Sequence, residues 1–439
     1  MKTIIEFPFS VAETPDLGIV LADGTRLSAR VWKPEGQGPF PAILEFLPYR
    51  KRDGTVVRDA LTHPYLAGHG YVCLRVDMRG NGDSDGLMAD EYSPQELSDA
   101  CEVINWIATQ DWSNGRVGMM GISWGGFNSL QVAALQPEPL KAIITLCSTV
   151  DRYADDIHYK GGCLLNENLG WGATMWAYSS RPPDPGLRQG WHEMWMDRLK
   201  AEPFLPALWL RHQRRDDYWK HGSVCEDYSK IRAAVLAVGG WGDSYKNAVP
   251  QLVENIASPV KGIVGPWVHK YPHFAVPHPR IGFLQEALRW WDRWLKDEPT
   301  GVEDDPAYRV YLMDGVRPQR WYENRPGRWI AEPSWPSPNV ETQTLPLGPG
   351  TLGQGGAFEI AVNSPQDCGM EGGEYCAIWL GPEMPGDQRR DDVLSACFDS
   401  VALDQTDIVG APVLSLTLSS DKPLAQIAVR LNHVHPDGA

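Results

Sequence analysis

The residues Gly121-Ile122-Ser123-Trp124-Gly125 form the pattern with the clearest chemical meaning in this chain. They match G-x-S-x-G, in which a serine on a strained turn between a strand and a helix exposes its hydroxyl as a nucleophile. Apolar residues at 117–122 predict that strand, and residues 124–135 predict the helix that follows it. The glycines two positions before and after the serine are small because Cβ atoms there would collide with the strand and the helix. We therefore predict Ser123 as a nucleophile; a tight turn with an incidental serine is the alternative.

A serine hydroxyl needs a base that accepts its proton and a carboxylate that orients the base. In hydrolases of the α/β type these residues follow in the order Ser, Asp or Glu, His, each on a loop after a strand. Asp243 lies just past a predicted strand at 233–238, and His269 lies just past another at 262–265. We predict these two as acid and base, with His273 as the fallback base. A helix cap at Asp243 and a packed loop histidine at His269 are the alternatives.

The oxyanion of the reaction also needs hydrogen-bond donors. One is the backbone N–H of Trp124, the residue after the serine. The second is expected from the loop after an early strand at 42–47, which reads Pro48-Tyr49-Arg50-Lys51-Arg52 and contains no HGGG-type glycine run. The Tyr49 hydroxyl is therefore the predicted side-chain donor, although a tyrosine beside proline is more often structural.

Strands and helices alternate through the part of the chain that must position these residues. Apolar runs at 42–47, 71–76, 117–122 and 142–147 predict buried strands, and Asp23-Gly24 predicts a hairpin turn within 19–32. A capping box at Ser93-Pro94-Gln95-Glu96 predicts the start of a helix. Repeated β-α-β alternation predicts an α/β sheet with helices on both faces.

The pattern divides the chain into three regions. Residues 1–149 and 232–299 are the predicted α/β-hydrolase core, and 150–231, which hold six of the 19 tryptophans, are a predicted helical cap inserted between two strands. Residues 300–439 are a predicted β-sandwich or jelly roll, because Leu414 to Leu418 and Ile427 to Leu431 alternate apolar with polar residues. The last residues, Pro436-Asp437-Gly438, form a turn signal with no strand after it, so we expect this β-domain to be incomplete.

Composition excludes several classes of protein. The chain of 439 residues has a net charge of −16, which argues against a nucleic-acid partner. No run approaches the ~18 apolar residues of a membrane-spanning helix, and the N-terminus lacks a secretory signal. Eight cysteines without a CxxC pair predict free thiols in a reducing compartment, no metal site and a cytoplasmic protein.

These motifs together resemble the CocE/NonD hydrolases, a group that includes cocaine esterase, X-prolyl dipeptidyl peptidases, α-amino-acid ester hydrolases and cephalosporin acylases. The resemblance covers nearly the whole chain in order. It rests on the segments already quoted and on Asp77–Gly86, Gly240–Asp243, Gly265–His269, Trp290–Lys296 and Asp387–Asp392.

The resemblance implies an α/β-hydrolase core, a helical cap and a C-terminal jelly roll. It also implies Ser123 as nucleophile, Asp243 as orienting acid and His269 as base, with Tyr49 and Trp124 forming the oxyanion hole. The loop at 77–86 is expected to be structural and not a nucleotide site. Two features depart from the family pattern: its members normally continue past residue 439, and Asp243 is followed by Ser244-Tyr245-Lys246, without the carboxylate that holds the substrate ammonium group in α-amino-acid ester hydrolases.

That second departure disfavours substrates with a free α-amine. Asp155 and Asp156 in the cap could compensate, but a solvated acidic turn is the favoured interpretation. We expect a serine hydrolase that cleaves small esters or amides through an acyl-enzyme, without a cofactor, with an aromatic cap that suits apolar or aromatic groups. An X-prolyl dipeptidyl peptidase and a catalytically inert binding or assembly protein remain as alternatives, and a homodimer is left open.

Overall fold

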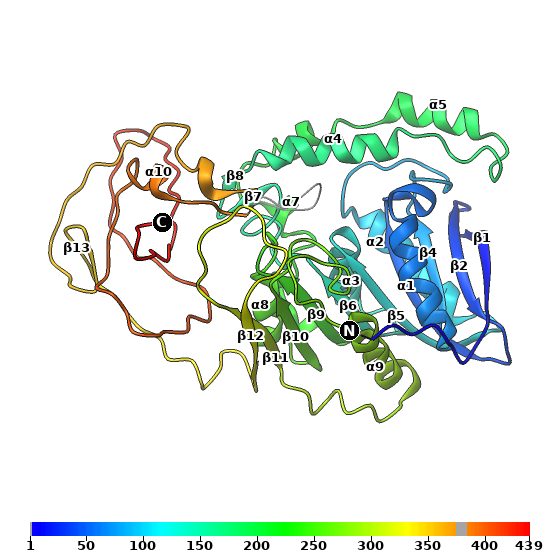
Figure 1. The fold of residues 1–439 in the computed structure, drawn as a ribbon. Coiled ribbons are helices and arrows are strands. Elements are labelled where there is room, and N and C mark those ends of the chain that lie inside the picture. Colours follow the sequence, from blue (N-terminus) through cyan, green and yellow to red (C-terminus); the bar gives the residue numbers. More distant parts are fainter. Residues whose placement is uncertain (1, 375–383) are drawn as a thin grey trace.

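The computed structural model describes residues 2–374 and 384–439, and its centre is a ten-stranded mixed sheet (Figure 1). Neighbouring strands follow one another in the order β1-β2-β4-β3-β5-β6-β9-β10-β11-β12. Their bounds are β1 (Val11–Val20), β2 (Arg26–Pro34), β3 (Phe40–Leu47), β4 (Val72–Asp77), β5 (Ser113–Ile122), β6 (Leu140–Leu146), β9 (Ala234–Gly240), β10 (Val260–Gly265), β11 (Tyr308–Met313) and β12 (Gly327–Glu332).

The strands from β4 to β11 are parallel, and the antiparallel pairs lie at the two edges. Every residue of β3, β4 and β9 is buried, as expected for parallel strands that are covered on both faces. β1 and β2 form the predicted hairpin, and Gly24 in its turn has φ +85°. Because parallel strands end at the same edge, the loops after β3, β5, β9 and β10 converge there, and these loops carry the predicted site residues.

Helices cover both faces of the sheet, as predicted. α1 (Val56–Gly68) and α9 (Phe283–Lys296) contact each other on one face, and α2 (Pro94–Ala108) and α3 (Trp124–Leu135) contact each other on the opposite face. α8 (Ala248–Asn255) packs against β9 and β10. The predicted helix start is confirmed, because the Ser93 hydroxyl accepts a hydrogen bond from the Glu96 N–H at the start of α2. The Glu96 side chain does not complete the capping box, because its Oε1 accepts from Trp124 Nε1 instead.

The chain between β6 and β9 contributes no strand to the main sheet. Figure 1 shows α4 and α5 beyond the edge of the sheet core. The elements of this insertion are β7 (Tyr159–Lys160), β8 (Cys163–Leu164), α4 (Glu167–Ser179), α5 (Trp191–Ala201), α6 (Leu205–Trp209), α7 (Asp217–Lys220) and the 3-10 turns η2 (Val224–Glu226) and η3 (Tyr228–Lys230). A cap made mainly of helices therefore stays our interpretation of residues 150–231.

The chain after residue 299 first extends the main sheet through β11 and β12. It then forms a small lobe with few regular elements: β13 (Leu347–Gly348), β14 (Thr351–Leu352), η4 (Met370–Gly372) and α10 (Arg389–Asp392). The strands predicted at 414–418 and 427–431 were wrong for this structure, which has no strand among residues 400–439. Their alternating apolar side chains are exposed, because no facing sheet lies within the described residues to bury them.

One further short element, the π-turn η1 (Arg50–Gly54), follows β3 and holds the Tyr49 loop. No helix in the described part of the chain is both long enough and apolar enough to span a membrane.

Candidate active site

Ser123 lies at the turn between β5 and α3, as predicted. Its backbone has φ 58° and ψ −126°, a conformation that is unfavourable for a residue with a side chain. A Cβ at Gly121 would lie 2.6 Å from the Cα of Gly125, so the small residues of the motif allow strand and helix to meet closely. The sequence thus imposes a sharp turn that places the serine at the carboxyl edge of the sheet.

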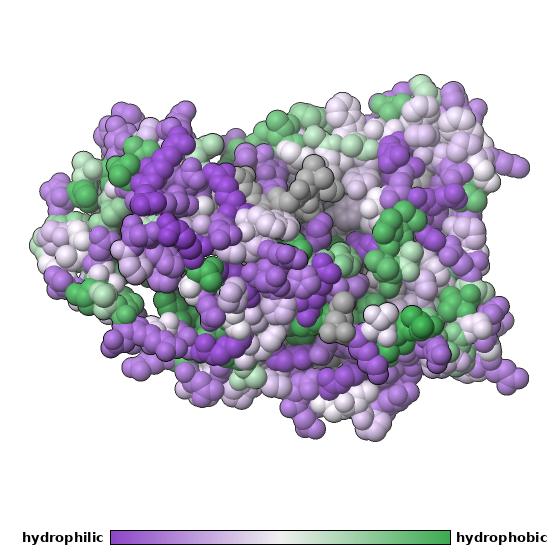
Figure 2. Space-filling view, viewed as in Figure 1, coloured by the Kyte–Doolittle hydropathy of each residue, from purple (hydrophilic) through white to green (hydrophobic). Residues whose placement is uncertain are grey.

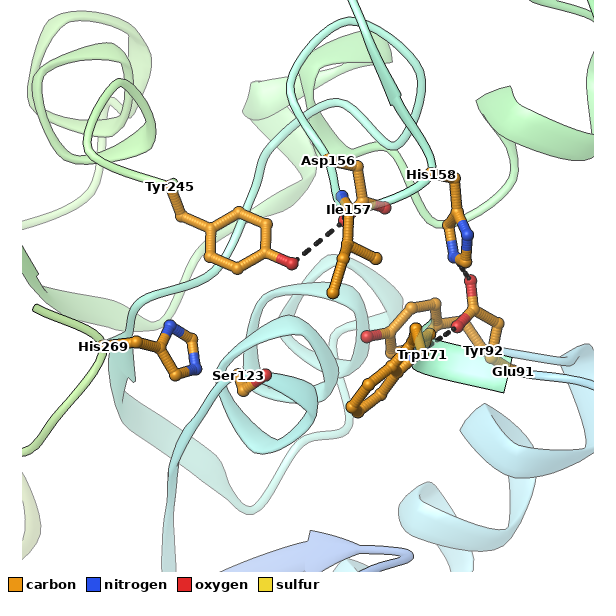
Figure 3. Close-up of a pocket in the computed structure, with 9 residues that line it drawn as sticks. All are labelled: Glu91, Tyr92, Ser123, Asp156, Ile157, His158, Trp171, Tyr245 and His269. Carbon is orange, nitrogen blue, oxygen red and sulfur yellow. Dashed lines mark hydrogen bonds and ion pairs between the residues drawn. The ribbon is translucent and has the colours of Figure 1, made fainter. Parts of the chain in front are cut away.

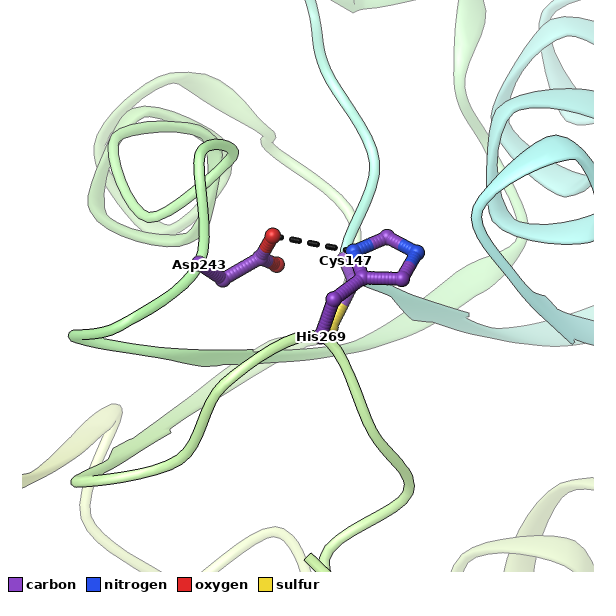
Figure 4. Close-up of side chains that lie close together, drawn as sticks. All are labelled: Cys147, Asp243 and His269. Carbon is purple, nitrogen blue, oxygen red and sulfur yellow. Dashed lines mark hydrogen bonds and ion pairs between the residues drawn. The ribbon is translucent and has the colours of Figure 1, made fainter. Parts of the chain in front are cut away.

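Asp243 and His269 are brought together from the loops after β9 and β10. His269 Nδ1 lies 2.9 Å from Asp243 Oδ1, and both side chains are buried (Figure 4). Burial alone would raise the pKa of the Asp243 carboxyl, but the charge and hydrogen bond of His269 and the thiol of Cys147 hold it below its ordinary value. Asp243 therefore stays ionised and can orient the imidazole.

Ser123 and His269 line the same pocket. Figure 3 shows the two side chains next to each other, with a ring nitrogen of His269 on the side of Ser123. The opposite wall combines aromatic and charged groups. The remaining lining residues are Glu91, Tyr92, Asp156, Ile157, His158, Trp171 and Tyr245.

The two predicted oxyanion donors also lie at Ser123. The Tyr49 hydroxyl is 3.5 Å from Ser123 Oγ. Burial raises the pKa of Tyr49 well above its ordinary value, although hydrogen bonds with Ser123 and with the Trp124 backbone lower it in part. The hydroxyl therefore remains protonated and can donate. The Trp124 N–H hydrogen-bonds to this hydroxyl, so the two predicted donors lie next to each other beside the serine.

The Trp124 side chain is held in place within the core. It is fully buried, and its Nε1 donates a 2.6 Å hydrogen bond to Glu96 Oε1. Burial raises the pKa of the Glu96 carboxyl to about 8. Glu96 was predicted only as part of the capping box, because nothing in its local pattern shows that its side chain points inward.

His273, the fallback base, lies away from the pocket. Its ring stacks on Phe283 and contacts Phe274, and burial followed by the charge of Arg280 lowers its pKa to about 4. A histidine that stays neutral inside an aromatic cluster is a packing residue. The structure therefore favours His269 over His273 as the base.

The interpretation of Asp155 and Asp156 as a solvated acidic turn was wrong. Both are buried, and Asp156 lines the pocket with Ser123. Asp156 Oδ1 accepts a hydrogen bond from the Tyr245 hydroxyl at 3.3 Å, and burial raises the pKa of this carboxyl to about 7. Asp155 pairs with Lys160. Adjacent acidic residues usually face solvent, and only the tertiary fold turns these two inward.

A buried ionic cluster that the sequence reasoning missed joins the insertion to the core. Glu91, in the loop before α2, lies 3.0 Å from Arg152 Nη2 and 2.6 Å from His158 Nε2. It also accepts a hydrogen bond from Trp171 Nε1 at 3.2 Å. These charges hold the pKa of Glu91 at about 2 despite burial. No short motif marks this set, because its members come from three separate segments.

The loop at 77–86 is a structural turn, as expected. Lys51, fully buried, lies 2.6 Å from Asp83 and 3.5 Å from Asp77. Lys51 Nζ also donates to the Ser28 hydroxyl. The carboxylates of this loop are therefore neutralised from within the protein.

Two groups of described residues have the ligand types and spacing that a metal ion requires: Cys147 with Asp243 and His269, and Glu45 with Asp59 and His63. In the second group, Arg58 lies 2.7 Å from Glu45 and Arg75 lies 3.4 Å from Asp59. Two guanidinium groups already neutralise those carboxylates and repel a cation.

A parallel-centred sheet with a serine at a strained strand–helix turn, and an Asp–His pair on later loops, defines the α/β-hydrolase class. The chain belongs to the X-Pro dipeptidyl-peptidase (S15) family, whose model matches residues 23–271. Residues 300–439 match the X-Pro dipeptidyl-peptidase C-terminal non-catalytic domain. The protein is therefore a serine hydrolase.

The relatives of this chain include esterases and peptidases. The chain is 26% identical to cocaine esterase of Rhodococcus sp., over 99% of this chain and 82% of that protein. It is 21% identical to the Xaa-Pro dipeptidyl-peptidase of Lactobacillus helveticus, over 84% of this chain and 48% of that protein. The likeness therefore extends further along the esterase than along the peptidase.

Solved structures agree on the fold. A CocE/NonD family hydrolase from Staphylococcus aureus superposes with a TM-score of 0.62 at 22% identity, covering 80% of this chain and 61% of that one. An α-amino acid ester hydrolase superposes with a TM-score of 0.57 at 18% identity, covering 80% of this chain and 64% of that one. The chain spans less than two thirds of the length of these two structures.

Proposed function

We propose that Ser123, His269 and Asp243 form a catalytic triad that hydrolyses carboxylic esters of small molecules. The observation that carries the proposal is the 2.9 Å contact of His269 with Asp243 at the pocket that Ser123 lines. Because Nδ1 faces the carboxylate, Nε2 is the nitrogen available to the serine hydroxyl. We also propose, from the spacing of the cysteines, that the enzyme works in the cytoplasm.

The reaction follows from these positions. His269 accepts the proton of Ser123 as Oγ attacks the substrate carbonyl carbon, and the Tyr49 hydroxyl and Trp124 N–H donate hydrogen bonds to the resulting oxyanion. The imidazolium then passes its proton to the leaving alkoxide as the ester bond breaks. A water molecule, deprotonated by His269, attacks the acyl-enzyme, and the proton returns to Ser123 Oγ as the acid is released.

The aromatic wall supports an apolar or aromatic substrate group. Tyr92, Trp171 and Tyr245 line the pocket opposite the serine. Aromatic surfaces of this kind gain free energy from excluding water around an apolar group. We therefore propose esters with an aromatic or compact apolar acyl group as the preferred substrates.

The test compares initial rates on a short-chain p-nitrophenyl ester for the wild type, Ser123→Ala and Ser129→Ala. The first variant is expected to lose about 10⁴-fold or more in kcat. Ser129 lies in α3, the helix that follows Ser123, and its hydroxyl donates to the Gly125 carbonyl, so its variant should retain turnover. Ester turnover that survives in Ser123→Ala would overturn the mechanism. A fluorophosphonate probe should label the wild type and not Ser123→Ala, whereas an inert fold would not react.

One observation favours a second candidate, hydrolysis of substrates with a free amine, including X-prolyl peptides. Asp156 is a buried carboxyl in the pocket, and the pKa of about 7 means that it gains charge through the neutral range. A substrate ammonium group would pair with the ionised form. Cleavage of Gly-Pro-p-nitroanilide, with a KM that falls from pH 6 to 8 in the wild type but not in Asp156→Asn, would establish this candidate. Absence of anilide cleavage beside rapid ester turnover would exclude it.

A further inference from the structure

Cys147 occupies an unusual position directly after β6. Its backbone has φ 47°, and its side chain is buried. Ser123 N–H donates to the carbonyl of the preceding residue, Leu146, so Cys147 lies close to the strand–helix turn. Nothing in the proposed mechanism uses its thiol.

The Cys147 thiol lies next to the Asp243–His269 pair. One ligand atom from each of these three residues lies within 4.8 Å of the other two, and all three residues are buried (Figure 4). No nitrogen or oxygen donor of the described residues gives a hydrogen bond to Asp243 Oδ2. The Cys147 thiol hydrogen-bonds to this carboxyl and contributes to lowering its pKa. The group therefore contains a thiol, an imidazole and a carboxylate that already interact.

Sulfur, nitrogen and oxygen ligands in one small site favour Zn²⁺ and similar thiophilic ions. Bonds to such an ion are about 2.0–2.3 Å long. To close the site, His269 Nδ1 and Asp243 Oδ1, now 2.9 Å apart, would separate slightly, and a side-chain rotation would bring Cys147 Sγ toward them. Three protein ligands leave a fourth position for water. His269 itself lines the pocket of Ser123, which offers an ion a path to the site.

The charges around this group differ from those around Glu45. Lys246 Nζ donates to the backbone carbonyl of Asp243 at 3.3 Å, and its charge contributes less than that of His269 to lowering the pKa of the Asp243 carboxyl. At Glu45, by contrast, two guanidinium groups, those of Arg58 and Arg75, pair with the carboxylates.

We infer that Cys147, Asp243 and His269 bind a thiophilic divalent cation of the Zn²⁺ type, and that the bound ion switches the enzyme off. On binding, the Cys147 thiol releases its proton to solvent. The Nδ1 of His269 becomes a ligand, so the ring proton moves to Nε2. An imidazole protonated at Nε2 cannot accept the proton of Ser123. The inhibition, but not the binding, rests on the proposed roles of His269 and Asp243.

Binding is tested first without reference to activity. Co²⁺ is titrated into the full chain, and the near-ultraviolet thiolate-to-cobalt absorption is followed in the wild type, Cys147→Ser and Cys225→Ser. Cys225 is a matched control because its thiol also contacts a carboxylate, Asp151, at 3.5 Å, but forms no three-ligand group with the residues that the structure describes. The wild type and Cys225→Ser should show the band. Cys147→Ser should lose the band. Its Co²⁺ affinity should fall by more than about 10–100-fold, which is the typical loss when a residue that only supports a metal ligand is replaced. An unchanged band in Cys147→Ser would overturn the inference.

Inhibition is measured second, as the rate at each Zn²⁺ concentration divided by the same variant's metal-free rate. At a Zn²⁺ concentration about tenfold above the dissociation constant, about 90% of the sites are occupied. The wild type should therefore lose about 90% of its ester turnover there and recover it when a chelator is added. Cys147→Ser should need at least a tenfold higher Zn²⁺ concentration. A thiolate band with no inhibition would contradict the roles proposed for His269 and Asp243 while supporting the site. Equal inhibition of both proteins would overturn the inference.

Discussion

At the scale of single residues, Tyr49 makes the sharpest prediction about the reaction. Tyr49→Phe removes a neutral O–H donor 3.5 Å from Ser123 Oγ and keeps the ring. Loss of one oxyanion donor typically lowers kcat by about 10²–10³-fold, and we expect KM to change little. The measurement is steady-state kinetics on a p-nitrophenyl ester.

Tyr178→Phe is the matched control for this variant. The centre of its ring lies 5.6 Å from that of Tyr49. Among the described residues, however, its hydroxyl makes no hydrogen bond to Ser123. It should keep kcat within a few fold. Equal losses in the two variants would mean that the Tyr49 hydroxyl has no specific role in the oxyanion hole.

Glu96 makes a prediction about stability and pH. Its pKa in the folded protein is about 8, above the ordinary value of 4.5, because burial disfavours the charged carboxylate. The folded state therefore binds the Glu96 proton more tightly than the unfolded state. Its contribution to stability is complete below pH 4.5 and is lost as the pH rises to about 8.

The measurement is the free energy of unfolding by urea from pH 5 to 9. Glu96→Gln keeps an acceptor for the Trp124 indole and cannot ionise. The difference between this variant and the wild type should therefore shift in favour of the variant as the pH rises. Glu102→Gln, on the same helix, is the control. A pH-independent difference for Glu96→Gln would contradict the buried, protonated carboxyl.

At the scale of elements, the close contact between the ends of β9 and β10 holds Asp243 and His269 together. A Cβ at Gly240 would lie 2.1 Å from the carbonyl oxygen of Trp267, a main-chain atom that cannot rotate away. Gly240→Ala should therefore separate the two loops. We expect a loss of about 1–3 kcal/mol in stability and a larger proportional loss of ester turnover.

The neighbouring residue supplies the control. A Cβ at Gly239 would meet only the Val249 side chain, at 3.1 Å. Gly239→Ala should cost less in stability and should retain turnover, as measured by thermal unfolding and initial rates. If Gly240→Ala were as active as Gly239→Ala, the spacing of these loops would not determine the site.

At the scale of the whole molecule, the surface is uneven. Polar groups cover much of the view in Figure 2, yet apolar patches interrupt them. Several apolar side chains of the C-terminal lobe are open to solvent, and Val413 and Leu424 are 90% and 85% exposed. Apolar surface of this extent favours association with another surface.

We therefore expect this chain to self-associate as its concentration rises, measured by light scattering coupled to size exclusion. Replacing both Val413 and Leu424 by Glu should shift the molecules toward the monomer and lower the binding of a hydrophobic dye. Exposed charges disfavour close contact between copies. Unchanged association in the double variant would place the contact elsewhere on the molecule.

Local signals in the sequence were sufficient for the frame of the site. The helix of residues 124–135, the hairpin turn at Gly24 and the helix N-cap at Ser93 depend on neighbours within a few positions, so their patterns identify them. The order of Ser123, Asp243 and His269 after successive strands was likewise sufficient to predict that they meet, because parallel strands end at a common edge. The same reasoning predicted strands at 414–418 and 427–431 that this structure does not form. Apolar and polar residues alternate there, but no strand among the described residues pairs with them.

What the sequence determined by itself was the strand–turn–helix around Ser123 and the succession of loops that carry Asp243 and His269. The tertiary structure decided which other side chains surround them. Asp156 faces the pocket, Cys147 lies against the Asp–His pair, and Glu91 ties the insertion to the core. The physical reason is that these contacts join segments far apart in the chain, so the burial and charge that define them arise only when the fold closes.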